Sequence, residues 1–143
     1  MTSSTEIHTG DIGEALCYYR LLQMGVPCRI VNLGATDILA ILDDDVVIRV
    51  QVKTAHQTFD PRYKNRSAFY GFNVCRGSKE KRRFLEHEID VFACVGLEDE
   101  SIIFYQAKHL LQKKTHKVKA HLFSDSGVTQ DSWSKAIKPL LYT

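Results

Sequence analysis

The sequence predicts an α/β fold in which a mixed central β-sheet is flanked by helices. Three observations carry this prediction: an amphipathic helical pattern over residues 12–24, two apolar stretches around an acidic turn within residues 36–53, and a second helical pattern over residues 131–141. The chain of 143 residues has no internal repeat and no low-complexity tract. It is therefore expected to form one domain over residues 1–143.

The first helix is predicted where apolar side chains recur at steps of three and four over residues 12–24. Asp11 is suited to cap this helix, and Glu14 follows at the spacing of a capping box. Gly25 lies just past the last apolar residue, where helices commonly end. Residues 2–8 are expected to be a loose N-terminal segment.

The acidic turn and its apolar flanks predict a β-hairpin over residues 36–53. If the hairpin folds about Asp44, Asp37 lies opposite Gln51 on the neighbouring strand. Partners across two strands point to the same face of a sheet, and Lys53 follows Gln51 by two positions. All three polar side chains are therefore expected on one face. A one-residue slip of register would separate Asp37 from Gln51.

Strands separated by polar segments are expected between the hairpin and the closing helix. Residues 54–66 are predicted to be a surface loop with interleaved basic and aromatic residues, and residues 76–86 a basic loop that turns into a short helix. The closing helix is expected to be capped by Asp131 or Ser132. Further strands are predicted over residues 67–74, 89–95 and 101–106, with helical turns over residues 107–112.

Charge and cysteine usage limit the possible classes. The formal net charge is only +2, so a nucleic-acid interface would depend on where the cations lie. Because no two cysteines form a CxxC pair, all four are expected to be buried or half-buried thiols, which suits a reducing compartment. The cysteines are Cys17, Cys28, Cys75 and Cys94.

Neither a secretory signal nor a membrane-spanning segment is expected. The N-terminal residues are polar, and no apolar stretch approaches the roughly 20 residues that cross a bilayer. We therefore expect the protein in the cytoplasm, or in the DNA-containing compartment of its host, with no membrane partner.

The order of acidic, amide and lysine side chains resembles the PD-(D/E)XK nuclease superfamily. Glu14 on the first helix, Asp37 on one strand and Gln51-Val52-Lys53 on the next carry the resemblance. Residues 88–93 are similar to a later strand of the branch that holds Holliday-junction-resolvase-like enzymes and group I intron homing endonucleases. The resemblance covers roughly residues 8–107 and implies a restriction-endonuclease-like fold, with residues 108–143 adding a basic segment and a helix.

The resemblance implies a Mg²⁺ site, with Mn²⁺ able to substitute. Asp37 would anchor the metal, with Gln51 Oε1 and the Val52 carbonyl beside it. Lys53 would orient or deprotonate the attacking water, or stabilise charge on the phosphate, and Glu14 would complete the site. Gln51 departs from the family pattern because most members carry a carboxylate there, and a neutral amide oxygen should bind Mg²⁺ more weakly. Thr36 replaces the customary proline.

Each of these residues also has an ordinary structural explanation. Glu14 fits a capping box, and Asp37 could bond to the turn before its strand. A glutamine and a lysine are common on an exposed sheet face. Asp90, the one acid in an apolar strand, is expected to pair with Lys53 or a nearby arginine or to cap an element, with a direct metal role as the lesser alternative.

A basic track in the middle of the chain is a candidate clamp for phosphates. The alternative is that these cations form only a solvated face. Lys113, Lys114 and Lys117 add further positive charge later in the chain. The candidate nucleic-acid-binding residues are Arg62, Lys64, Arg66, Arg76, Lys79, Lys81, Arg82 and Arg83.

These features predict a metal-dependent DNA endonuclease that hydrolyses phosphodiester bonds. A homing or site-specific endonuclease is favoured because the Gln-Val-Lys-Thr sequence is similar to the intron-endonuclease group. A structure-specific Holliday junction resolvase, a catalytically inactive nucleic-acid-binding module of the same fold, and a subunit of a larger assembly without a DNA role are the alternatives. One active site per chain implies at least a homodimer for cutting both strands.

Overall fold

The structure, a computed structural model, describes the chain except for residues 1, 44–45, 60–66, 77–81, 85–87 and 142–143. Within the elements, the side chains of residues 2–7, 76, 82 and 83 also lie outside the described part. Predictions for Arg62, Lys64, Arg66, Lys79 and Lys81 therefore fall outside the described residues.

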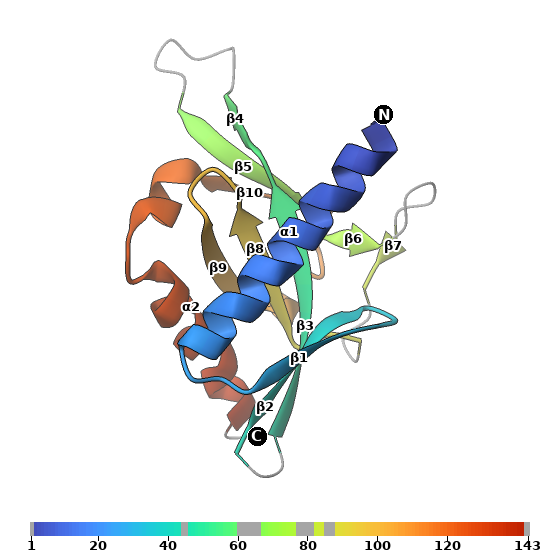
Figure 1. The fold of residues 1–143 in the computed structure, drawn as a ribbon, viewed down its shortest axis with the longest axis vertical. Coiled ribbons are helices and arrows are strands. Elements are labelled where there is room, and N and C mark those ends of the chain that lie inside the picture. Colours follow the sequence, from blue (N-terminus) through green and yellow to red (C-terminus); the bar gives the residue numbers. More distant parts are fainter. Residues whose placement is uncertain (1, 44–45, 60–66, 77–81, 85–87, 142–143) are drawn as a thin grey trace.

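A mixed sheet of five strands forms the centre of the molecule (Figure 1). Its order is β1-β2-β3-β8-β9, with β3 and β8 parallel and all other neighbours antiparallel. The strands are β1 (Cys28–Leu33), β2 (Thr36–Leu42), β3 (Val46–Ala55), β8 (Val91–Gly96) and β9 (Ser101–Gln106). The predicted α/β fold with a mixed central sheet is confirmed.

Two helices pack on one face of this sheet: α1 (Thr2–Gln23) and α2 (Val128–Leu141). Cys17 and Leu21 of α1 and Trp133 of α2 are buried against alternate residues of the strands. The Trp133 ring meets Phe104 of β9 edge-on, with ring centroids 5.0 Å apart. Apolar burial on this face supplies the main driving force that docks both helices.

The opposite face is covered by a small antiparallel sheet of order β10-β5-β4 and by short 3₁₀ helices rather than by another long helix. Tyr70 lies at the centre of this second core and meets Phe123 edge-on at 4.8 Å between centroids. The elements are β4 (Gln57–Phe59), β5 (Ala68–Asn73), β10 (Thr115–Lys119), η1 (Ala107–His109) and η2 (Ala120–Ser124).

The helix boundaries differ from those predicted. α1 begins at Thr2, so Asp11 and Glu14 lie inside the helix, and both the capping box and the loose N-terminus are wrong. Once the C-terminal half of α1 is docked on the sheet, each further residue adds a hydrogen bond at little cost. Gly25 follows α1 at φ +82°, as expected of a helix-terminating glycine.

The closing helix also begins earlier than predicted, at Val128, so Asp131 and Ser132 are not its caps. Instead, the Ser132 hydroxyl accepts the backbone N–H of Phe104 at 2.9 Å and thereby caps the edge strand β9. The partner of the Ser132 hydroxyl, the Phe104 N–H, lies far away in the sequence. A prediction from local helix-capping preferences could therefore not find it.

Two predicted loops form strands. Strand β3 runs on to Ala55 and is followed by β4, so the loop prediction for residues 54–66 is wrong for residues 54–55 and 57–59. In the basic segment, β6 (Cys75–Arg76) pairs with β7 (Arg82–Arg83), and the helix expected there is absent from these residues. The polar residues 115–119 form β10 on the outer edge of the small sheet. Cross-strand pairing overrides weak local propensity in these segments.

The structure also bears on the cysteines and on membrane-spanning segments. All four cysteines are free and buried, as predicted. In the described part of the chain, no helix is long and apolar enough to cross a membrane.

Candidate active site

The β2–β3 hairpin has the predicted register. Ile38 pairs with Val50 and Ile41 with Val47, which is the pairing that sets Asp37 opposite Gln51. The backbone pairing of β2 with β3 begins at Ile38. Asp37, the residue before it, uses its carboxylate as a hydrogen-bond acceptor. Asp37 Oδ2 accepts the Val52 backbone N–H at 2.8 Å and Gln51 Nε2 at 2.8 Å. The predicted contact between Asp37 and Gln51 is confirmed.

A cleft of about 450 Å³ opens beside this pair, and we refer to it as the Asp37 cleft. Glu14 from α1 and Lys53 from β3 line it together with Asp37 and Gln51. The four residues that the sequence singled out therefore converge, although they come from three elements. The other residues that line the cleft are Thr9, Gly10, Val52, Thr54, Ala55 and His56.

Glu14 reaches the cleft because α1 crosses β3 at very short range. A Cβ atom on Gly13 would lie 1.8 Å from Thr54 Oγ1, so only glycine permits this approach. Burial, followed by repulsion from Asp37 and Asp11, raises the pKa of Glu14 to about 7. Burial also raises the pKa of Asp37, although the Val52 N–H opposes the shift. The two carboxyl groups thus form a half-buried pair that favours a shared proton or a bound cation.

Asn32 also belongs to this site, although it was not among the residues predicted from the sequence. With its amide oriented so that Nδ2 faces the cleft, Asn32 donates to Glu14 Oε1 at 3.1 Å and to Asp37 Oδ1 at 3.2 Å. Its backbone has φ +49°, a conformation that asparagine tolerates better than most residues. The role of the Asn32 amide becomes visible only when α1 and β2 flank it.

Lys53 is half-buried and lines the cleft. Its Nζ donates to the Cys75 carbonyl at 3.2 Å and lies 5.2 Å from the centroid of the Phe84 ring. Burial lowers the pKa of Lys53, while attraction to Asp37 partly offsets the shift. The ammonium is thus held in a partly desolvated setting where it interacts with the Asp37 charge, and its own charge acts strongly there.

Asp90 lies outside the Asp37 cleft and pairs with an arginine, one of the expected outcomes. Its carboxylate accepts Arg49 Nε at 3.0 Å, Arg49 Nη2 at 3.1 Å and the Arg49 backbone N–H at 2.8 Å. His56, by contrast, lines the cleft, and its Nδ1 lies 2.8 Å from Glu98 Oε2.

The predicted basic track is only partly described. Arg76 lies on β6, and Arg82 and Arg83 lie on β7, while their side chains are outside the described part. The first residue of β6, Cys75, accepts the hydrogen bond from Lys53, so the backbone of the β6–β7 ribbon contacts a residue that lines the Asp37 cleft.

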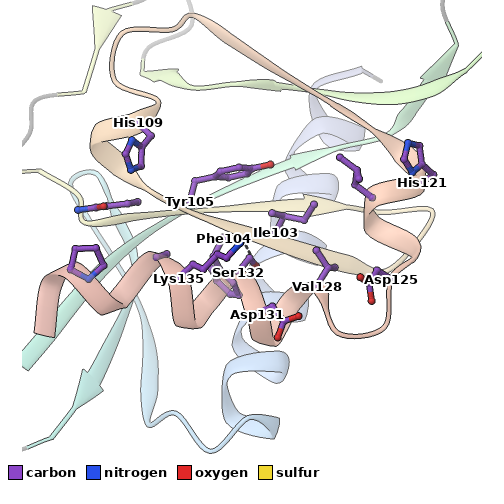
Figure 2. A pocket seen from close by; sticks show the side chains of 14 residues that line it. Ile103, Phe104, Tyr105, His109, His121, Asp125, Val128, Asp131, Ser132 and Lys135 are labelled. Atoms are coloured by element: carbon purple, nitrogen blue, oxygen red, sulfur yellow. Dashed lines mark hydrogen bonds between the residues drawn. The ribbon is translucent and has the colours of Figure 1, made fainter.

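A larger groove of about 780 Å³ lies between α2, β9 and the two 3₁₀ helices (Figure 2), and we refer to it as the α2 groove. Figure 2 shows His109 and His121 at its opposite ends, and Asp125 and Asp131 near η2 and the start of α2. Among the described residues, no hydrogen bond or ion pair joins two of these titratable side chains. The α2 groove is larger but lacks converging polar groups, so the Asp37 cleft is the better candidate site.

The chain matches no protein-family model and no curated protein sequence. Among solved structures, it is similar to a bacterial homing endonuclease, I-Ssp6803I, with a TM-score of 0.67 and 14% sequence identity. The match covers 94% of this chain and 95% of that chain. At this identity the likeness shows the fold alone: the chain folds as that endonuclease does over nearly its full length.

Proposed function

We propose that this chain is a divalent-metal-dependent DNA endonuclease of the PD-(D/E)XK type, with its chemistry in the Asp37 cleft. The observation that carries the proposal is the convergence of Glu14, Asp37, Gln51 and Lys53 on one cleft. Packing alone gives no reason to gather two carboxylates, an amide and an ammonium there. The fold likeness to a homing endonuclease supports the same class.

The donor atoms of the cleft suit a hard cation such as Mg²⁺. The Asp37 and Glu14 carboxylates, Gln51 Oε1 and the Val52 carbonyl all offer oxygen. A cation would also relieve the repulsion that helps to raise the pKa of Glu14. When bound, such an ion would polarise the phosphate and activate water, and Mn²⁺ is expected to substitute. Among the described residues no three His, Cys, Asp or Glu side chains are grouped to hold a metal, so the amide and carbonyl oxygens are needed.

The chain's own groups would divide the remaining work. Asp37 is held rigidly by Gln51 Nε2 and the Val52 N–H, which leaves its Oδ1 directed toward Asn32. Lys53, held at 3.2 Å by the Cys75 carbonyl, would orient the attacking water or stabilise charge that develops on the phosphate. Burial lowers the pKa of Lys53 and so increases the fraction of neutral amine that could act as a base.

Gln51 supports a second candidate, an inactive DNA-binding module of the same fold. Its amide nitrogen, rather than Oε1, faces Asp37 at 2.8 Å. The amide must rotate before Oε1 can serve as a ligand, and a neutral oxygen binds Mg²⁺ less strongly than a carboxylate. Gln51→Glu is therefore expected to lower the Mg²⁺ concentration needed for half-maximal cleavage. An unchanged metal requirement would remove Gln51 from the ligand set.

Cleavage assays separate these candidates. The purified chain is incubated in Mg²⁺ or Mn²⁺ with a plasmid library that carries randomised inserts and with a synthetic four-way junction. Linearisation of a subset of the library indicates a site-specific endonuclease, our favoured reading because the similar fold belongs to a homing endonuclease. Cutting of the junction alone would indicate a resolvase.

Matched variants make the test specific to the cleft. Asp37→Ala and Lys53→Ala should each lower cleavage about 100-fold or more. Asp43→Ala, on the exposed turn of the same hairpin, and Lys108→Ala, an exposed lysine of η1, should cleave as wild type does. If wild type and the cleft variants all bind DNA in a salt-sensitive manner and none of them cleaves it, the inactive module is favoured. If wild type does not bind DNA near physiological salt, both candidates are overturned.

Double-strand cleavage needs two active sites, and each chain supplies one. We therefore propose that the active species is at least a homodimer. Sedimentation of the protein on uncut duplex, in Ca²⁺ in place of Mg²⁺, should give two or more chains per site. Nicking of one strand by a stable monomer would contradict the proposed assembly and leave the chemistry intact.

A further inference from the structure

The small sheet β10-β5-β4 has two faces of opposite character. Its inner face places Tyr70, Phe72 and Val118 in the second core, where each is nearly or fully buried. Because side chains alternate along a strand, the intervening residues form the outer face. These outer-face residues are Thr58, Phe69, Gly71, Asn73, Thr115, Lys117 and Lys119.

The outer face is polar and positively charged, and none of its seven residues is acidic. Lys117 and Lys119 are exposed on β10, opposite Gly71 and Phe69 of β5. Lys117 Nζ lies 5.3 Å from the centroid of the Phe69 ring, a cation–π contact that holds the ammonium over the face. Asn73 and Thr115 form a cross-strand pair at the end of the ribbon and provide neutral hydrogen-bonding groups.

One end of this face is linked to the Asp37 cleft through Cys75. The Cys75 carbonyl holds Lys53, and the Cys75 backbone N–H donates to Asn73 Oδ1 at 3.1 Å on the last residue of β5. At the other edge, β4 starts directly after His56, which lines the cleft. In Figure 1, β4 and β5 run from this region beyond the central sheet, toward the end of the molecule where the N-terminal end of α1 lies. A duplex that places a phosphate in the cleft would therefore lie along the small sheet.

The dimensions and surface of the β5–β10 ribbon suit duplex DNA. Two paired strands lie about 5 Å apart, and the major groove, about 12 Å wide, admits a two-stranded β-ribbon. Gly71 leaves the centre of the face without a side chain, and glycine within a strand commonly marks the close approach of a ligand. Side chains of the Asn73–Thr115 pair can hydrogen-bond with base edges, while lysines neutralise phosphates.

We propose that the outer face of the β5–β10 ribbon docks duplex DNA in the major groove, with Lys117 and Lys119 on flanking phosphates. This proposal rests on the proposed endonuclease function and deepens it, because it names the surface that would select a target. Reading of base edges by a ribbon beside the cleft is the property expected of a site-specific enzyme, whereas a junction resolvase would need shape recognition.

Salt-dependent binding tests the two lysines. Affinity of the full chain for a fluorescein-labelled linear duplex is measured in EDTA over a KCl series. Each lysine that neutralises one phosphate contributes about one unit to the slope of log Kd against log salt. The Lys117→Ala/Lys119→Ala double variant should therefore lower the slope by about two units and weaken binding about 10-fold near physiological salt.

The control carries the same charge change on the other side of the central sheet. Lys135 and Lys138 are exposed on α2, and Lys135→Ala/Lys138→Ala should leave the slope within about half a unit of wild type. An unchanged slope in the β10 variant, or an equal loss in the α2 variant, would overturn the proposal.

A steric test removes no charge. A Cβ on Gly71 would meet only the Phe69 ring, at 3.8 Å, so Gly71→Val should fold normally while its side chain fills the centre of the face. Binding should weaken several-fold with the salt slope unchanged. A duplex with glucosylated hydroxymethylcytosine, which fills the major groove, should bind wild type more weakly than the unmodified duplex. Groove docking would be overturned if wild type bound both duplexes with equal affinity. It would also be overturned if Gly71→Val and wild type bound the unmodified duplex equally well.

The outcome is separable from that of the proposed function. If wild type cleaves DNA while the ribbon variants bind normally, the endonuclease proposal stands and the docking surface fails. If the ribbon variants lose salt-dependent binding while wild type shows no cleavage in Mg²⁺ or Mn²⁺, the docking surface stands and the enzyme fails.

Discussion

The Asp37 carboxylate lies where two strands stop pairing, and this local feature organises the candidate site. The β2–β3 ladder ends at Ile38, so the backbone N–H of Val52 takes a side-chain oxygen as its acceptor. The same oxygen accepts Gln51, and the other oxygen lies at 3.2 Å from Asn32. One carboxylate thus joins three elements of the chain.

Asn32 is expected to position both acids. Asn32→Gly removes the bridging amide and keeps a residue that tolerates φ +49°. If the cleft is catalytic, cleavage should fall about 10-fold or more through a weaker metal response, as for other residues that hold ligands. The free energy of unfolding should change by about 1 kcal/mol or less. Full activity at limiting Mg²⁺ would contradict a positioning role.

Glu14 should make the metal-free protein less stable at alkaline pH. Its pKa rises from 4.5 to about 7 on folding, so its stabilising contribution is complete below about pH 4.5 and is lost as pH rises through 7. After allowance for solvent screening at this half-buried group, the loss amounts to about 1–2 kcal/mol.

Glu14→Gln removes this titration. Urea unfolding in EDTA should therefore show the variant more stable than wild type at pH 8, with the difference shrinking at pH 5. A difference between the two proteins that stays constant over this range would contradict the raised pKa.

At the scale of elements, the contact between α1 and β3 decides whether the site assembles. Gly13→Ala places a Cβ 1.8 Å from Thr54 Oγ1, so the helix must move away from the strand and carry Glu14 with it. We expect a loss of about 1–3 kcal/mol in the free energy of unfolding, together with lower cleavage.

Gly10→Ala is a matched control on the same helix. Its Cβ would meet nothing within 4 Å, so the better helix propensity of alanine should stabilise the protein by about 0.5–1 kcal/mol. In urea denaturation, the change in the free energy of unfolding should have opposite signs for Gly13→Ala and Gly10→Ala. Adding Thr54→Gly to Gly13→Ala should restore part of the lost stability. Equal stability of both single variants would show that α1 does not depend on this contact.

For the whole molecule, the two cores should unfold together. They share strand β8, whose Val91 and Ala93 point into one core and whose Phe92 and Cys94 point into the other. Loss of either core therefore exposes the strand that supports the other. Fluorescence of Trp133, the single tryptophan, and far-ultraviolet circular dichroism should give coincident urea transitions. Separate midpoints would indicate two independent units.

Short-range patterns predicted the parts of the site that lie on one hairpin. The acidic turn determined the register, and register with side-chain alternation placed Asp37 beside Gln51 and directed Lys53 to the same face. The strand β10 and the role of Asn32 escaped prediction because their partners are remote in sequence. The start of α1 escaped it because the helix extends from a C-terminal half that is docked on the sheet.

The sequence by itself determined the α/β class, the central hairpin and the identity of the polar residues on it, because strand period and turn chemistry are local properties. Only the tertiary structure decided that α1 approaches β3 closely enough at Gly13 for Glu14 to join them. It also decided that Asn32 bridges the two acids and that Cys75 links Lys53 of the cleft to a small sheet with exposed lysines. Those features depend on packing between distant segments, and packing is settled by the whole core at once.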